Sequence, residues 1–139
     1  MENNNSSKRL IHSKQFNIRW GEMDAYAHLN NTTYFFYTQE ARFEMLTENG
    51  IKIDTKGIAP ILAQTSCKFI RPIVYPERIV IDSYLVNVAG KKVIFEHVIS
   101  SATKPGTTYA ISDSVVVWYD FQNLQSVEVP DSVRATFEK

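Results

Sequence analysis

The stretch RWGEMDAYAHLNNTTYFFYTQEAR, residues 19–42, decides how the rest of the sequence is interpreted. Its first part is a short polar segment that carries the carboxylate of Asp24 and the imidazole of His28. This segment runs directly into a long, aromatic-rich stretch of helical character. One polar connector, residues 21–31, and one long helix therefore serve as the reference for assigning the segments before and after them.

We expect this helix to extend from Asn31 to about Glu48. Asn30 or Asn31 can supply the side-chain oxygen that caps the first turn, and the pair Asn49-Gly50 is typical of a helix end. Aromatic side chains at positions 34–37 make the front half apolar almost all round. Helices of this kind are usually buried, so we expect this half to be covered on most sides.

The segments before and after the helix have the alternation of strands. A short strand is expected over Lys14–Trp20, and four long strands follow the helix, separated by turn signals such as Arg71-Pro72 and Pro105-Gly106. The later connections are too short for crossover helices, so the sheet should be mostly antiparallel. One long helix against one curved five-stranded antiparallel sheet is an α+β architecture. The later strands are expected at residues 58–70, 77–88, 93–99 and 108–119, with Val93, Phe95, His97 and Ile99 sharing one face and Tyr109, Ile111, Val115 and Val117 sharing another.

The chain has 139 residues, of which 44% are hydrophobic, which is enough for one domain with a real core and argues against disorder. We expect a flexible N-terminal tail over residues 1–13 and a single domain over residues 14–139. The single cysteine, Cys67, excludes an intrachain disulfide and a cysteine-based zinc site. Because it lies in an apolar run, we expect a small core residue rather than a nucleophile.

Charge and hydropathy argue against several classes of protein. Lys and Arg together number 15, as do Asp and Glu, so the basic excess of a nucleic-acid binder is lacking. The polar N-terminus lacks the apolar stretch of a signal peptide, and no apolar run approaches the ~18 residues that span a bilayer. We therefore expect a cytoplasmic protein that binds neither nucleic acid nor a membrane.

Asp24 is the first candidate for a chemical role. If the helix begins near Asn31, its first backbone N–H groups lack partners within the helix and form donors beside the connector. A carbonyl oxygen could accept from these donors while its carbon faces Asp24, or a water that Asp24 holds. An Asp just before a helix is also a common cap or turn former, so spacing alone leaves both interpretations open.

Other acids and histidines compete with this interpretation. Glu22 would share the side of Asp24 in an extended connector, and Glu40 lies in the helix, where such a residue is usually solvated or ion-paired. His28 either transfers a proton or fixes the loop through a backbone hydrogen bond. His97, on an apolar face, is expected to be a packed core or interface residue.

No metal site or cofactor site is predicted. The three histidines are too scattered in the sequence to suggest a metal cluster, and no glycine-rich phosphate loop occurs. Lys91 and Lys92 form a small basic turn, which is either an ordinary solvated turn or a contact for a substrate phosphate.

The stretch resembles the hotdog-fold acyl-CoA thioesterases of the 4-hydroxybenzoyl-CoA thioesterase type. The resemblance covers residues 14–137 in its order of elements. Arg71-Pro72 and Asp120 resemble further family positions. The motif itself consists of Arg19-Trp20, Glu22, Asp24, His28-Leu29-Asn30-Asn31, Tyr34 and Glu40-Ala41-Arg42.

This resemblance implies a five-stranded sheet wrapped around a central helix, with subunits paired as homodimers or homotetramers and active sites at the dimer interface. It implies hydrolysis of acyl-CoA to free acid and CoA without a cofactor. Asp24 would be nucleophile or general base, and the backbone N–H at Asn31 would polarise the thioester carbonyl. His28, Asn30 and Tyr34 would support the site. A hotdog dehydratase and a non-catalytic acyl-CoA binding protein are the alternatives.

Ala27 departs from the family pattern, in which the residue before His28 is usually glycine. Glycine permits a positive φ that alanine resists. If the loop needs that conformation, the site carries slight strain.

Overall fold

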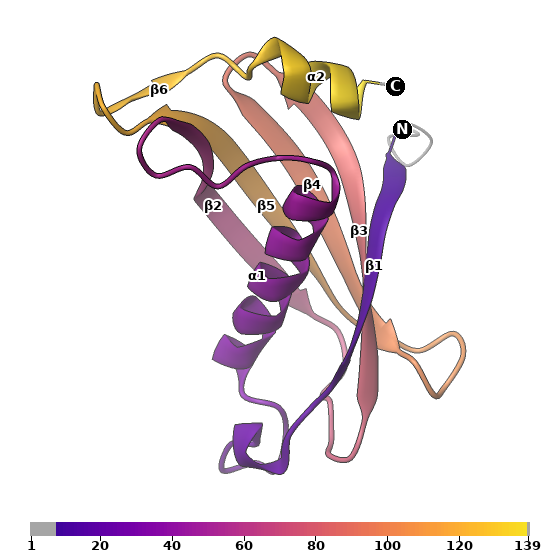
Figure 1. Ribbon diagram of the computed structural model, residues 1–139. Helices are drawn as coiled ribbons and strands as arrows, with labels where there is room; N and C mark the ends of the chain where they lie inside the picture. Colours follow the sequence, from indigo (N-terminus) through magenta and orange to yellow (C-terminus); the bar gives the residue numbers. More distant parts are fainter. Residues whose placement is uncertain (1–7, 139) are drawn as a thin grey trace.

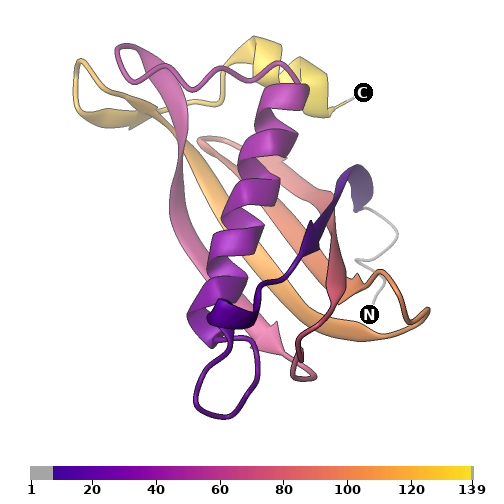
Figure 2. The ribbon, with the colours of Figure 1, turned by 60° about the horizontal axis from the view of Figure 1, so that its bottom comes forward.

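The computed structural model describes residues 8–138, which form one antiparallel sheet, one long helix and a short C-terminal helix. The strands are ordered β1-β3-β4-β5-β2, and β6 pairs with β5. Figures 1 and 2 show α1 lying across one face of the curved sheet, with α2 at one end. In chain order the elements are β1 (Arg9–Asn17), a 3-10 turn η2 (Trp20–Glu22), α1 (Asn31–Glu48), β2 (Ile58–Phe69), β3 (Arg78–Ala89), β4 (Lys92–Ser101), β5 (Thr108–Asp120), β6 (Gln125–Val127) and α2 (Asp131–Phe137).

The α+β class, the long helix and the antiparallel order are confirmed, but the expected count of five strands and one helix is wrong. The described residues form six strands and two helices. The sixth strand, β6, has three residues, and α2 has seven. Elements this short leave too few residues for a periodic hydrophobic pattern, although Pro130 directly before α2 is a usable start signal.

The first strand begins earlier than expected. β1 starts at Arg9, which pairs with Leu85 of β3, so residues 9–13 of the expected flexible tail belong to the sheet. His12 lies within this strand and is buried. The strand also ends earlier, because Trp20 starts the 3-10 turn and is 75% exposed. Residues 1–7 of the expected tail lie outside the described residues.

The prediction that Val93, Phe95, His97 and Ile99 share one face of β4 is confirmed, and all four are buried. On β5, the prediction that Tyr109 shares a face with Ile111, Val115 and Val117 is wrong. Tyr109 and Ala110 are adjacent and both buried, where β4 and β5 change register between Ile99 and Ser100. This irregularity shifts the alternation by one residue. Ser112, Ser114, Val116 and Trp118 are therefore buried against the helix side, and Ile111, Val115 and Val117 are only half-buried.

The core has two apolar clusters along α1. One surrounds Tyr34 and Tyr37 near the start of the helix, and the other surrounds Met45 and Leu46 near its end. The front half of α1 is less buried than predicted, because Phe36 is 51% exposed. The helix therefore covers the sheet with one side and presents aromatic surface on another.

Candidate active site

A tight loop connects η2 to α1 and carries Asp24. The backbone N–H of Asp24 donates to the carbonyl of His28 at 2.8 Å, and the N–H of Ala27 donates to the carbonyl of Asp24 at 2.9 Å. Ala27 has a φ of +62°, the left-handed conformation that glycine adopts without cost. The conformation that the sequence raised as a possibility is therefore present, and the alanine carries the strain.

The carboxylate of Asp24 is fixed through one oxygen. Oδ1 accepts the backbone N–H groups of Tyr26, at 2.9 Å, and of His28, at 3.3 Å. Within residues 8–138 no donor is bonded to Oδ2. Asp24 is half-buried. One oxygen thus orients the group, and the other is available to a ligand or a water.

Asp24 lies between two surface depressions. The first, of about 460 Å³, is also lined by His28, Asn31, Tyr34 and the segment 69–72; we call it the Asp24 groove. The second, of about 440 Å³, is lined by Trp20, Val74 and Tyr75 among others. A substrate that crosses this loop would contact Asp24 from either side.

The start of α1 has an unbonded backbone N–H group beside the Asp24 loop. Asn30 is the cap, because its Oδ1 accepts the backbone N–H of Thr32 at 3.0 Å, and its carbonyl accepts from Thr33 at 2.9 Å. The N–H of Asn31, the first helical residue, has no acceptor in the described part of the chain. Asn31 lines the Asp24 groove. The groove therefore combines a free carboxylate oxygen with a free N–H group.

His28 and Tyr34, the predicted supporting residues, both line the Asp24 groove. The backbone of His28 closes the loop on Asp24, which is the loop-fixing role considered for this residue. Tyr34 is buried, and its ring packs edge-on against Phe69 at 4.9 Å. Burial is the main cause that raises the pKa of Tyr34 to about 12, so its hydroxyl stays protonated at neutral pH. Both residues shape the groove around Asp24.

The rival acids lie elsewhere or have partners. Glu22 Oε1 accepts the backbone N–H of Arg19 at 2.8 Å and the hydroxyl of Tyr37 at 2.5 Å, so it fastens η2 to α1. Burial and this hydrogen bond raise the pKa of Tyr37 far above its ordinary value. Glu40 is exposed and lines a different depression, with Lys14.

Lys91 and Lys92 are not brought to the groove within one chain. Lys91 lies in the turn between β3 and β4, and Lys92 is the first residue of β4. This turn lies beside the residues that precede α2, where Val129 N–H donates to the carbonyl of Gly90. Figure 1 shows this turn at the opposite end of the sheet from the start of α1. A substrate bound at Asp24 would have to extend along the length of the sheet to contact Lys91 or Lys92 of the same chain.

Arg71 and Tyr26 line the Asp24 groove and were not selected as site residues. Arg71 is the second residue after β2, and the sequence marks it only as a strand end and as a position of family resemblance. Its exposed guanidinium gives the rim of the groove a positive charge. In the sequence, the dipeptide Arg71-Pro72, which is a position of family resemblance, is the signal that could have pointed to Arg71 as a site residue.

One group of side chains in residues 8–138 has the composition of a metal site. His12, Glu44 and Glu48 offer ligand atoms within 4.8 Å of one another. The ammonium of Lys14 lies 2.9 Å from Glu44 and already supplies positive charge there. The group was not predicted, because His12 had been assigned to the tail. No helix in residues 8–138 combines the length and apolar character needed to cross a membrane.

Three proteins are similar to this chain, two of them in structure and sequence and one in sequence. A putative thioesterase of Pseudomonas aeruginosa, the PA2801 protein, is 32% identical, with a TM-score of 0.85 over 93% of this chain and 99% of that one. A putative acyl-CoA thioesterase of Xanthomonas campestris is 30% identical, with a TM-score of 0.72 over 79% of this chain and 93% of that one. The chloroplastic acyl-acyl carrier protein thioesterase ATL3 of Arabidopsis thaliana is 25% identical over 91% of this chain and 67% of its own length.

The sequence pattern and the fold agree with the match to a family model. The model that describes the thioesterase-like superfamily matches residues 18–137, which include the Asp24 loop and all of α1 to β6. The resemblance recognised in residues 19–42 is confirmed. The chain belongs to the thioesterase-like superfamily, and it is a thioester hydrolase with the hotdog fold.

Proposed function

We propose that this protein hydrolyses acyl-CoA to a free acid and CoA, with Asp24 as nucleophile or general base. The observation that carries the proposal is the pairing, in one groove, of the free Oδ2 of Asp24 with the free N–H of Asn31. A thioester carbonyl that accepts from this N–H presents its carbon to the carboxylate side of the groove.

Both routes keep the same roles for the surrounding residues. As a base, Asp24 takes a proton from water while the water oxygen attacks the carbonyl carbon; as a nucleophile, it attacks the carbon itself and water later cleaves the anhydride. In each case the negative charge on the carbonyl oxygen is stabilised by Asn31 N–H. When this oxyanion collapses, the C–S bond breaks, and the thiolate leaves and is protonated. On the nucleophilic route this step forms the anhydride, which water then hydrolyses. Water is the only co-reactant, so the proposed reaction needs no metal or redox cofactor.

The proposed assembly is a homodimer or homotetramer in the cytoplasm. β2 is an edge strand of twelve residues, paired on one side only with β5 within the described chain. Long exposed edges tend to pair with another strand. Phe69 and Ile70, 46% and 44% exposed, lie at the end of this edge and also line the Asp24 groove. A partner that paired with β2 would cover the apolar side of the groove.

The proposal is tested by following thiol release from a panel of acyl-CoAs with wild type, Asp24→Asn and Glu40→Gln. Asp24→Asn keeps the shape of the side chain and removes its charge, so kcat should fall at least about 100-fold. Glu40→Gln is the matched control, and it should leave kcat within about twofold.

Three results would contradict the assignment. An Asp24→Asn enzyme as fast as wild type would exclude the catalytic carboxylate. A large loss in Glu40→Gln with a nearly silent Asp24→Asn would indicate a helix-centred site of the dehydratase type. Saturable binding of acyl-CoA by wild type with no thiol release would indicate a binding protein.

A further inference from the structure

Arg42 is a buried cation without a counter-ion. The residue is 6% exposed, and no hydrogen bond or ion pair to its guanidinium occurs within residues 8–138. Its nearest aromatic neighbour is Phe43, with the guanidinium carbon 6.0 Å from the ring centroid. Burial lowers the pKa of Arg42, and no neighbouring anion acts against this effect.

The acidic side chain closest to Arg42 in the sequence of α1 after Glu40, that of Glu44, is already engaged. Glu44 is bonded to His12 and Lys14, both at 2.9 Å. His97, the buried polar group on the facing strand, is hydrogen-bonded to Ser83 and Ser114 and offers no negative charge. The positive charge of Arg42 is therefore uncompensated among the described residues.

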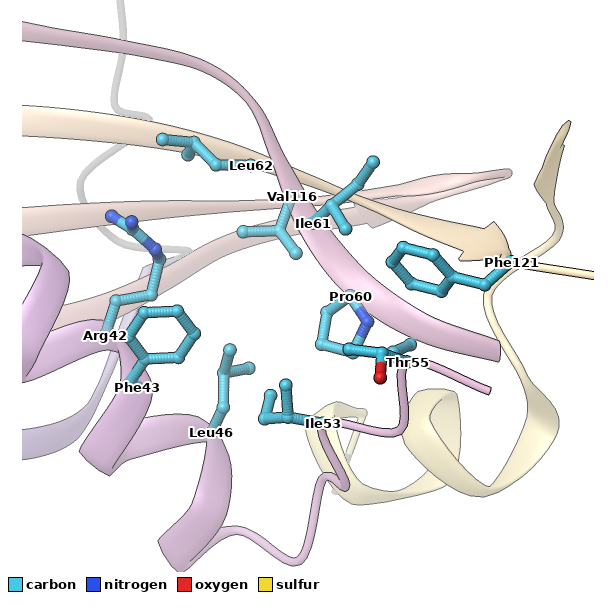
Figure 3. A pocket seen from close by; sticks show the side chains of 11 residues that line it. Arg42, Phe43, Leu46, Ile53, Thr55, Pro60, Ile61, Leu62, Val116 and Phe121 are labelled. Carbon is cyan, nitrogen blue, oxygen red and sulfur yellow. The ribbon is translucent and has the colours of Figure 1, made fainter. Parts of the chain in front are cut away.

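The guanidinium lies at one end of a pocket between α1 and β2 (Figure 3). Among the side-chain nitrogen and oxygen atoms of residues 8–138 that are not in exposed residues, only His12 Nδ1 is both fully shielded and unbonded, so the unbonded nitrogens of Arg42 are not fully shielded. The pocket measures about 240 Å³. At the ~30 Å³ that one water occupies, this encloses roughly eight non-hydrogen atoms. The exposed outer side at Ile53 leaves the last carbon or two of a slightly longer chain in the opening.

Apart from Arg42 and Thr55, the side chains that line the pocket are apolar. Leu46 and Val116 belong to the buried core, and Ile53, Leu62 and Phe121 form the outer part. Such a cavity suits a hydrocarbon chain and gains free energy from the apolar area it removes from water. A buried charge, in contrast, is costly until an opposite charge with hydrogen-bonding oxygens reaches it.

We propose that this pocket binds a carboxylate with a short aliphatic chain, the carboxylate paired with Arg42 and the chain against Leu46, Val116 and Phe121. The guanidinium fork matches both oxygens of a carboxylate. The pocket shares no lining residue with the Asp24 groove, so it is a second site. A free acid is also the product class of the proposed hydrolysis, but binding here needs no chemistry at Asp24.

The test is calorimetric titration of the intact protein with octanoate and with 1-octanol. Wild type should bind one octanoate per chain, and Arg42→Met should weaken octanoate binding at least tenfold while 1-octanol binding changes less than threefold. Lys52→Met is the matched control, because Lys52 is an exposed cation near the pocket that does not line it. Equal octanoate affinity in wild type and Arg42→Met would overturn the proposal.

A second variant decides the matter if Arg42→Met does not fold. Ile53→Trp, at a position that is 41% exposed, fills the pocket from outside and leaves Arg42 in place; it should abolish binding of both ligands. Retained octanoate binding in Ile53→Trp would place the ligand elsewhere and overturn the proposal.

Two further measurements separate this site from the other possibilities. Asp24→Asn should bind octanoate as wild type does, whether or not it hydrolyses acyl-CoA; lost binding would place octanoate in the catalytic groove. If wild type bound no octanoate and Arg42→Met dissociated an oligomer on gel filtration, the counter-ion would be a carboxylate of a second copy, and the proposal would be wrong.

Discussion

Asp24 and His28 are joined by two reciprocal hydrogen bonds. The N–H of Asp24 donates to the carbonyl of His28 at 2.8 Å, and the N–H of His28 donates to Oδ1 of Asp24 at 3.3 Å. This pairing closes the loop and occupies Oδ1, and among residues 8–138 Oδ2 accepts no hydrogen bond. It also requires the chain to reverse direction at Ala27, whose φ is +62°.

Ala27→Gly should stabilise the protein by roughly 0.5 kcal/mol. The left-handed conformation costs an L-residue about 1–2 kcal/mol, and the larger backbone freedom of glycine in the unfolded chain offsets about 0.4–1 kcal/mol of the gain. Urea unfolding of both proteins measures the difference. Ala25→Gly is the matched control, since Ala25 is exposed in the same loop and has no positive φ; it should be neutral or destabilising. Equal effects of the two substitutions would contradict the strain at Ala27.

Asn31→Pro should lower kcat by about 100- to 1,000-fold with little change in thermal stability. Proline is well tolerated at the first position of a helix, where its missing N–H has no helical partner, and Asn30 already has the extended backbone that a residue before proline adopts. The substitution therefore removes one candidate oxyanion donor, an effect of about 2.7–4 kcal/mol.

Asn31→Ala provides the control for this experiment. It removes the side chain and keeps the backbone N–H, so its kcat should remain within about threefold of wild type. If Asn31→Pro were folded and fully active, another group would stabilise the carbonyl oxygen. If both variants lost activity equally, the side chain of Asn31 would be the important part.

The helix and the location of the site were predictable because both depend on local chemistry. Asn30 can cap and Gly50 can adopt a positive φ wherever they stand, so α1 begins and ends at the predicted residues. The neighbourhood of Asp24 and Asn31 follows from seven residues of chain. The selection of Asp24 over Glu22 needed the family resemblance, because the partners of Glu22 include Tyr37, fifteen residues away.

The features that were not predicted depend on tertiary contacts. The polar strand β1 is held by its register with β3, so Arg9 to Ser13 give no local strand pattern of their own. The change of face in β5 arises from its irregular pairing with β4 near Tyr109. The lack of a counter-ion near Arg42 depends on which distant segments pack around it. A helical arginine in the sequence does not reveal those segments.

Acidification from pH 7 to pH 5 should destabilise the protein through His97 by about 2 kcal/mol. Burial, with the positive charges of Arg42 and His12, lowers the pKa of His97 to about 3. The unfolded state, with an ordinary His pKa of ~6.5, binds a proton in this range and the folded state does not, so stability falls as the pH drops below 6.5. Urea unfolding at the two pH values measures this loss. His97→Gln should lack it, and an equal loss in that variant would assign it to other groups.

A second destabilisation should begin below pH 4.5, through Glu77. Burial alone would raise the pKa of Glu77, but hydrogen bonds from Tyr109, Thr103 and Ser101, and from the N–H of Arg78, lower it to about 2. The stabilisation that this lowered pKa provides is fully present above pH 4.5 and is lost as the pH falls towards 2. The free energy of unfolding should therefore fall by about 2 kcal/mol between pH 5 and pH 3.

Tyr109→Phe separates this effect from that of His97. The substitution removes one donor to the carboxylate, so the pKa of Glu77 should rise and the loss between pH 5 and pH 3 should shrink. The loss between pH 7 and pH 5 should be unchanged, since Glu77 stays ionised there in both states. Urea unfolding at pH 7, 5 and 3 measures both intervals. A Tyr109→Phe protein with the wild-type loss below pH 5 would show that this hydrogen bond does not hold Glu77 in its ionised form.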